Sequence, residues 1–209
     1  MGHVESVNVA VVQTGPWTGR IGSTGIDKRP VAEPVEFTES GVAGDVVCDT
    51  KHHGAWYQAA YSFDVEELRH WSEELGKELV PGNAGENLST VGCDTSDAVV
   101  GERWRIGSVV LRVTGPRQPC RVFQAFWDVE QWIKRFTAHG RPGAYFAVEE
   151  PGRISAGDTV EVLSRPEHGV TVADVFALTL QRRKELSAHV AQVLPDLPEK
   201  WRAEVARAL

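Results

Sequence analysis

The chain has 209 residues, of which 42% are hydrophobic and 24% charged, as in a folded globular protein with one sizeable core and an appendage. Lys and Arg total 22 against 29 Asp and Glu, so the formal charge is −7, and with no basic block a nucleic-acid polymer is excluded as the expected partner. No stretch has the length of apolar residues that a membrane span requires, and no signal-peptide pattern opens the chain. The chain has three cysteines, and no two of them form a Cys-x-x-Cys pair. We therefore expect no disulfide framework and a cytoplasmic location.

Short strands and glycine-rich turns dominate the sequence up to residue 165. Residues 4–12 are apolar and β-branched enough for a first strand, and a glycine-rich loop follows them. The clearest hairpin lies in residues 103–114, around a central Gly-Ser turn. Residues 159–163 have the pattern of a further strand. We therefore predict a mainly β fold built from β-barrel strands.

Two helices are expected to interrupt these strands. Asp64 and Glu67 make an acidic variant of a capping box, and apolar residues recur at helical spacing after them. The same arrangement recurs at Asp128 and Gln131, where the following apolar stripe is predicted to end at Gly140. The tryptophans on both stripes occupy positions that usually pack in a core rather than hold a cofactor.

The pattern changes at residues 164–169, and the remaining sequence favours helices. Thr171 and Asp174 form a capping box for a first helix, residues 183–194 have the spacing of a second, and Pro198 is suited to the start of a third. Three short amphipathic helices cannot each bury an apolar face alone, so they must pack together or against the sheet.

This change predicts a boundary between two domains. We expect residues 1–165 to form the β-barrel domain with its interspersed helices. Residues 166–209 are expected to form a small C-terminal domain of three helices.

Cys120 is the most informative single residue for function. Pro116 and Pro119 fix their own φ angles and bias the preceding residues away from the helical region, so the thiol is carried on a stiff, extended connector. Arg117 and Arg121 add positive charge that favours the thiolate if their side chains turn inward. The pattern indicates a nucleophile or a ligand for a soft metal. The alternative is a buried cysteine that packs as a small hydrophobic residue.

Two loops, residues 44–54 and residues 82–88, combine polar side chains with glycines. Glycine beside a charged residue lets a ligand approach the backbone closely, and histidine and lysine are natural partners for a phosphate or carboxylate. The polar residues and adjoining glycine that could bind are Asp45, Lys51, His52, His53, Gly54, Glu86 and Asn87. Alternatively, Glu86 caps neighbouring amides in a turn and the histidines are ordinary loop residues.

Two other kinds of site remain open at this stage. Cys48 and His52 have the local spacing of zinc ligands, but no second pair completes a tetrahedral site. A hydrolase triad would need Cys120, a histidine such as His52, and a carboxylate from Asp45 or Glu86. Only the fold can bring those residues together.

Seven motifs carry a resemblance to a known family when their order along the chain is considered. They are Gly25-Ile26-Asp27-Lys28-Arg29-Pro30-Val31, Gly44-Asp45, His53-Gly54, Gly85-Glu86-Asn87-Leu88, Ile106-Gly107, Pro116-Arg117-Gln118-Pro119-Cys120 and Gly157-Asp158. Together they resemble the MOSC-domain family, which is named for the C-terminal domain of molybdenum-cofactor sulfurases. The tail that begins at residues 168–172 resembles the three-helix extension of the stand-alone YiiM-type members, so the resemblance covers essentially the whole chain.

The resemblance implies a MOSC-type β-barrel that binds a molybdenum-pterin cofactor, with Cys120 as the cysteine that binds molybdenum or carries sulfur. Cationic and amide donors for the pterin phosphate would be Lys28, Arg117, His53 and Gly54. The residues for the pterin ring would be Asp45 and Asn87. Glu86 would be the proton carrier or a further pterin ligand.

For the YiiM type, the resemblance also implies a detoxifying reduction of N-hydroxylated small molecules, such as hydroxylaminopurine-like base analogues, to amines, without pyridoxal phosphate. The sequence has no dinucleotide or flavin fingerprint, so electrons would come from a separate flavin or haem reductase. The alternative is a non-catalytic carrier of the cofactor or of a persulfide on Cys120, or a barrel that has lost its site. We expect a monomer or homodimer.

Overall fold

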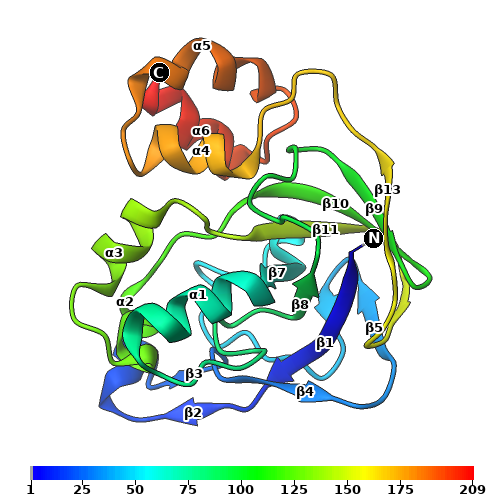
Figure 1. The fold of residues 1–209 in the computed structure, drawn as a ribbon, viewed down its shortest axis with the longest axis vertical. Helices are drawn as coiled ribbons and strands as arrows, with labels where there is room; N and C mark the ends of the chain where they lie inside the picture. The colour runs from blue at the N-terminus through cyan, green and yellow to red at the C-terminus, as the bar shows by residue number, and fades with distance from the viewer. Residues whose placement is uncertain (1) are drawn as a thin grey trace.

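The structure is a computed structural model that describes residues 2–209. Its main sheet has eight strands: β1 (His3–Ala10), β4 (Lys28–Val31), β7 (Ala60–Asp64), β8 (Leu88–Val91), β9 (Arg103–Ile106), β10 (Val109–Pro116), β11 (Ala144–Glu150) and β13 (Val160–Ser164). Their order is β13-β9-β10-β11-β7-β8-β1-β4 (Figure 1). Neighbours are antiparallel except β7 and β8, which run parallel because α1 (Val65–Leu75) crosses between them.

Two smaller sheets accompany the main one. The strands β5 (Val35–Thr38), β6 (Gly41–Val42) and β12 (Gly152–Ile154) form a three-stranded sheet in the order β12-β5-β6, and β2 (Gln13–Thr14) pairs with β3 (Ser23–Thr24). Short 3-10 turns lie at η1 (Pro16–Ile21) and η2 (Trp56–Gln58). In residues 2–209, no helix combines the length and apolar character that crossing a membrane would need.

The main sheet is open, with β4 and β13 at its two edges. A single bridge between His3 and Thr159 joins the start of β1 to the start of β13. Three backbone hydrogen bonds accompany it, from Val4 N to Asp158 O (2.9 Å), Gly157 N to Val4 O (2.8 Å) and Val160 N to Gly2 O (2.9 Å). The predicted mainly β fold with interspersed helices and a helical C-terminal region is confirmed. The sheet does not close into a barrel, because the contact between β1 and β13 is too short to form a ladder.

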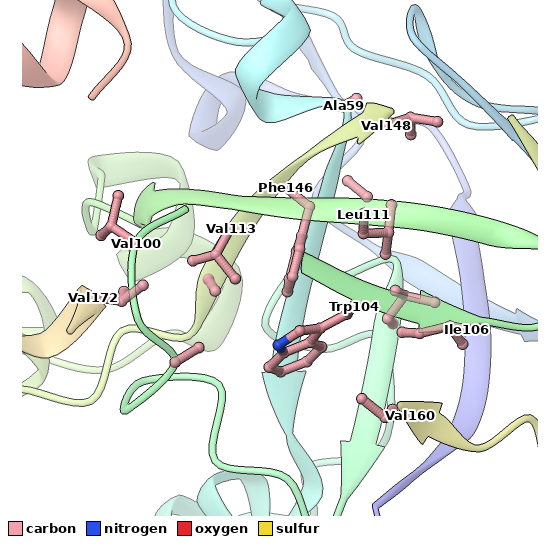
Figure 2. Close-up of a cluster of buried hydrophobic side chains, with 14 of the residues drawn as sticks. Ala59, Val100, Trp104, Ile106, Leu111, Val113, Phe146, Val148, Val160 and Val172 are labelled. Atoms are coloured by element: carbon pink, nitrogen blue, oxygen red, sulfur yellow. The ribbon is translucent and has the colours of Figure 1, made fainter. Parts of the chain in front are cut away.

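Apolar side chains of neighbouring strands form the main core. Figure 2 shows Phe146 of β11 and Trp104 of β9 facing one another, and their ring centroids are 5.2 Å apart. Leu111 and Val113 of β10 are fully buried beside them. This core holds β10 rigidly, and the segment that carries Cys120 leaves directly from the end of that strand.

The helix α1 begins where the sequence predicts, but its capping differs. The side chain of Asp64 makes no cap; it accepts hydrogen bonds from Thr90 Oγ1 (3.0 Å) and from the backbone N–H of Thr95 (3.1 Å). The predicted capping box of Asp64 and Glu67 is therefore wrong. The carboxylate instead links the start of α1 to β8 and to the loop that directly follows it.

The second predicted box is also wrong, because Asp128 belongs to the end of α2 (Arg121–Trp127) rather than to the start of α3 (Trp132–His139). Asp128 and Gln131 both have positive φ, at 50° and 56°, which no capping box allows. The predicted helix stop at Gly140 is confirmed, since this residue is left-handed (φ 79°) and its N–H bonds to Phe136 O.

The C-terminal region begins with α4 (Val172–Thr179), and here the predicted capping box is confirmed. Asp174 N donates to Thr171 Oγ1 at 3.1 Å, and Thr171 N donates to the Asp174 carboxylate at 3.0 Å. The predicted second helix is broken into η3 (Lys184–Leu186), α5 (Ser187–Val190) and η4 (Ala191–Val193). The last helix, α6 (Glu199–Ala208), has Pro198 as its N-cap.

Figure 1 shows the C-terminal helices gathered at the end of the molecule beyond β10 and β11. Side chains of α4 and α6, including Val175 and Val205, belong to the same buried cluster as the strands of the main sheet. Trp201 of α6 packs so closely on Gly115 of β10 that its indole occupies the space a Cβ there would need. This packing fixes α6 beside the end of β10, while the predicted domain boundary at residue 165 stays a prediction.

Candidate functional site

A cavity of about 540 Å³ lies among the loops around β4, β6, β8 and β10. Its volume is within the range of small-molecule and cofactor sites. Seven of the eight residues that the sequence indicates for the site line its wall: Lys28, Asp45, His53, Gly54, Asn87, Arg117 and Cys120. The eighth, Glu86, does not line the wall, although its neighbours Gly85 and Asn87 do.

Cys120 lies in extended backbone (φ −130°, ψ 170°) directly before α2, as its flanking prolines predict. The residue is half-buried, and its Sγ accepts a weak hydrogen bond from Phe123 N at 3.4 Å. Because the residue lines the cavity, its thiol is not a closed part of the hydrocarbon core. A ligand in the cavity would therefore lie against Cys120, which on its other side packs against the aromatic cluster that includes Phe123.

Arg117 is a buried cation on the same wall. Its side chain is packed against the ring of Phe123, whose centroid is 3.9 Å from the guanidinium carbon, and it donates to the carbonyl of Ala84. Among residues 2–209, no carboxylate forms an ion pair with Arg117. A buried charge with no counter-ion is costly, so this guanidinium is suited to hold an anionic group of a ligand.

Lys28, by contrast, already has a counter-ion inside the cavity wall. Its ammonium is paired with the carboxylate of Asp45, which also accepts hydrogen bonds from Asn87 Nδ2 (2.8 Å) and Ala10 N (2.9 Å). Burial lowers the pKa of Lys28, although the charge of Asp45 opposes this shift. The positive charge of Lys28 is therefore less available to a ligand in the cavity than its motif suggests. The charge of Arg117 is more available.

Removing the negative charge at Asp45 is expected to destabilise the fold. The variant Asp45→Asn would leave the Lys28 ammonium buried without a counter-ion, at a cost of about 3 kcal/mol in the free energy of unfolding. Urea denaturation at pH 7 measures this loss. The double variant Lys28→Met/Asp45→Asn removes both charges, so it should recover most of the stability. Equal losses in the single and double variants would contradict this account of the pair.

His53 lines the cavity, although much of its surface is exposed to solvent. Partial burial in the wall and the positive charge of Arg117 together lower the pKa of His53 to about 4. The imidazole is neutral at pH 7. His53 can therefore donate a hydrogen bond from one ring nitrogen, but it does not supply the positive charge that the sequence suggests.

Glu86 is fully buried and its carboxyl group is only partly satisfied. Its Oε1 accepts from Gly82 N (2.6 Å) and Ser89 Oγ (2.7 Å), while Oε2 has no hydrogen-bond partner among the described residues. Burial raises the pKa of Glu86 to about 7. The group holds the loop before β8 in place, and a direct contact with a ligand would need it to reach past Gly85 or Asn87.

A pH-dependent difference in stability is expected between the wild type and Glu86→Gln. The folded-state pKa of Glu86 is raised, so the stability that its protonated form contributes is fully present below about pH 4.5 and is lost as the pH rises to about 7. Glutamine does not titrate, and its Oε1 can keep both hydrogen bonds. Between pH 4.5 and pH 8, the variant should gain on the order of 2 kcal/mol relative to the wild type.

Urea denaturation at both pH values gives this difference directly. Burial also raises the pKa of Asp64 to about 7, but Asp64 is present in both proteins, so its contribution cancels. A difference between the variant and the wild type that does not change with pH would contradict the raised pKa of Glu86.

The structure adds residues to the cavity that the sequence did not indicate for the site. Tyr61 of β7 and Tyr145 of β11 line it with ring centroids 5.2 Å apart. Gln118 also lines it, and so does Cys48, which the sequence indicated only as a zinc ligand. The helix α6 contributes Lys200 and Trp201, which follow Cys120 by about eighty residues. No local pattern marks the two residues of α6, whereas Gln118 was visible only as part of the Cys120 segment.

The zinc site and the hydrolase triad are not assembled in the structure. Within residues 2–209, no three His, Cys, Asp or Glu side chains are grouped so that they could hold a metal ion. His52 pairs instead with the nearby carboxylate of Asp49, at 2.9 Å. Asp45 is committed to Lys28, so it does not orient a histidine toward Cys120.

The family follows from comparison with known proteins. The MOSC domain matches residues 49–161. The uncharacterized protein YflK of Bacillus subtilis (strain 168) is 32% identical over 202 residues, which are 96% of this chain and 91% of YflK. The chain therefore belongs to the MOSC domain family. It is also similar to the protein YiiM of Escherichia coli (strain K12), with 30% identity over 73% of this chain and 69% of YiiM.

Solved structures show that the fold is shared. The crystal structure of YiiM from Geobacillus stearothermophilus covers 100% of both chains with a TM-score of 0.82 at 24% identity. That of YiiM from Escherichia coli covers 99% of this chain and 92% of its own, with a TM-score of 0.73 at 23% identity. A Gibberella moniliformis protein named "Reductase" is 28% identical over 89% of this chain, which spans only 34% of that longer protein.

Proposed function

We propose that this protein is a molybdenum-cofactor-dependent oxidoreductase that reduces N-hydroxylated small molecules to amines. Its membership of the MOSC family and its similarity to a protein named "Reductase" support an oxidoreductase. The observation that carries the proposal is the position of Arg117, a buried cation with no carboxylate partner, on the same cavity wall as the half-buried thiol of Cys120. Hydroxylaminopurine-like base analogues are the substrates that we propose.

The residues of the cavity fit a molybdenum-pterin cofactor. A thiolate is the side chain best suited to a soft metal, so Cys120 would be the molybdenum ligand. The guanidinium of Arg117 would hold the phosphate of the pterin, with the neutral imidazole of His53 and the backbone at Gly54 as further donors. Asp45 or Asn87, which are hydrogen-bonded to one another in the wall, would contact the pterin ring. The bound cofactor would supply a metal that exchanges two electrons and accepts an oxygen atom.

The reduction consumes two electrons and two protons and converts an N-hydroxyl compound into an amine and water. The electrons would come from a separate flavin or haem reductase, as proposed from the absence of a nucleotide-binding motif. Tyr61 and Tyr145, whose rings are tilted by 44° to one another, would offer aromatic contacts for a planar base. We assign Glu86 a positioning role, because it holds the loop of Gly85 and Asn87 but does not line the cavity itself.

The assignment of Glu86 has its own test. In protein loaded with cofactor, Glu86→Gln should keep its turnover within about threefold of the wild type, since a proton carrier typically contributes a hundredfold or more. The measurement is turnover between pH 5 and pH 9. A larger loss together with a changed pH profile would restore Glu86 as the proton carrier.

The proposed function as a whole is tested with protein made in a host that synthesises the cofactor. We expect about one molybdenum per chain, and turnover of 6-hydroxylaminopurine with reduced methyl viologen as an artificial electron donor. Protein that carries molybdenum but reduces no N-hydroxylated compound would favour the carrier of cofactor. Sulfur labelling of Cys120 without reduction would favour a persulfide carrier. Protein that binds neither molybdenum nor sulfur would overturn both functions.

A further inference from the structure

The helix α6 forms part of the cavity wall even though it lies outside the residues that match the MOSC domain, 49–161. Two contacts fix its position: Trp201, which is 1% exposed, packs on Gly115, and Gln118 Nε2 donates to Glu204 Oε2 at 2.6 Å. Both contacts are made to the end of β10 and the segment that carries Cys120. The helix is therefore held in a defined place beside that segment.

Lys200 is the residue that this arrangement brings into the cavity. It is half-buried, and among residues 2–209 its ammonium group forms no ion pair. Its Nζ lies 5.8 Å from the ring centroid of Trp201, the residue that anchors the helix. Lys200 and His53 both line the cavity, and the positive charge of Lys200 is one of the smaller causes of the lowered pKa of His53.

The charges in the cavity are thus unevenly distributed. Lys28 is neutralised by Asp45, whereas Arg117, Arg121 and Lys200 have no carboxylate partners among the described residues, and Arg121 is exposed to solvent. Arg117 from the β10 segment and Lys200 from α6 line the same cavity, and together they attract an anionic group more strongly than either alone. Glu204, the acidic residue of α6 at this point, is held by Gln118 and does not pair with Lys200.

We propose that Lys200 binds a phosphate group of the ligand together with Arg117, so that the C-terminal helix completes the binding site. This inference rests on the proposed function for the identity of the ligand. Two sources of the phosphate share the same chemistry. The group belongs either to the cofactor or to an N-hydroxylated substrate in its nucleotide form.

The first experiment measures the binding of inorganic phosphate to cofactor-free protein by isothermal titration calorimetry. Lys200→Met should weaken binding about five- to tenfold, and Lys200→Arg should remain close to the wild type. Lys51→Met is the matched control, because it removes the same charge from an exposed lysine near His52 that does not line the cavity. Thermal unfolding confirms that each variant is folded.

Equal affinities in the Lys200→Met and Lys51→Met proteins would overturn the inference, and so would a wild type that binds no phosphate at millimolar concentration. Neither result contradicts the proposed function, which is tested separately by the molybdenum content and turnover of the wild type. If Lys200→Met binds phosphate weakly and also loses molybdenum, the phosphate belongs to the cofactor. If it keeps molybdenum but its KM rises for the nucleoside monophosphate and not for the free base, the phosphate belongs to the substrate.

Discussion

Cys120→Ala protein purified from a cofactor-competent host is expected to contain less than about a tenth of the molybdenum of the wild type. The reason is that a thiolate is the side chain best suited to a soft metal, and alanine at position 120 offers no donor atom in its place. Turnover of 6-hydroxylaminopurine should fall at least as far as the metal content. Metal analysis by mass spectrometry and the reductant assay on the same sample measure both quantities.

Cys48→Ala is the matched control for this prediction. Cys48 is also half-buried and also lines the cavity, so its removal changes the thiol content of the same site without changing Cys120. We expect it to retain molybdenum and turnover within about twofold of the wild type. If both variants lose the metal equally, the role of Cys120 as the ligand is wrong. If Cys120→Ala keeps molybdenum and turnover, the thiol takes no part in the proposed reaction.

Arg117→Met is expected to lower the retention of the cofactor but to leave the stability of the cofactor-free protein unchanged or higher. Without the guanidinium, the anionic group of the cofactor loses its buried charged partner, and we expect molybdenum content to fall tenfold or more. The cofactor-free protein should keep its free energy of unfolding within about 1 kcal/mol or become more stable, because methionine removes a buried charge that has no carboxylate partner. Metal analysis and urea denaturation of the cofactor-free protein test the two halves separately.

Arg121→Met provides the comparison for Arg117. Arg121 lines the cavity as well, but it is exposed to solvent, so the charge it contributes is screened and replaceable. This variant should retain most of its molybdenum. A large loss of stability in Arg117→Met would instead show that the guanidinium holds the fold together through Phe123 and Ala84. Unchanged molybdenum in Arg117→Met would contradict its role in binding the cofactor.

The helix signals show which features can be predicted from the sequence. The capping box of Thr171 and Asp174 and the glycine stop at Gly140 are confirmed, because each depends on hydrogen bonds within a few residues. The similar signals at Asp64 and Asp128 are wrong. Asp64 uses its carboxylate for Thr90 and Thr95, which approach it only through the sheet, and Asp128 takes a left-handed conformation at the end of α2.

The candidate site also combines features that depend on neighbouring residues with features that depend on residues far apart in the sequence. The flanking prolines predicted an extended connector at Cys120, and the structure has that conformation, with the residue half-buried. The ionisation of the neighbouring residues could not be predicted, because the pKa of a side chain depends on burial and on charges that are distant in the sequence. The neutral state of His53 and the pairing of Lys28 with Asp45 are examples.

The sequence by itself determined the mainly β character of the fold, the helical C-terminal region and the residue types that could bind a soft metal and an anion. Those features follow from periodicity, turn residues and side-chain chemistry, which act over short distances along the chain. The tertiary structure decided that the sheet stays open, that Arg117 rather than Lys28 has no counter-ion, and that Lys200 of α6 lies in the same cavity as Cys120. These outcomes depend on packing between remote segments, as Trp201 against Gly115 shows, and no local pattern encodes them.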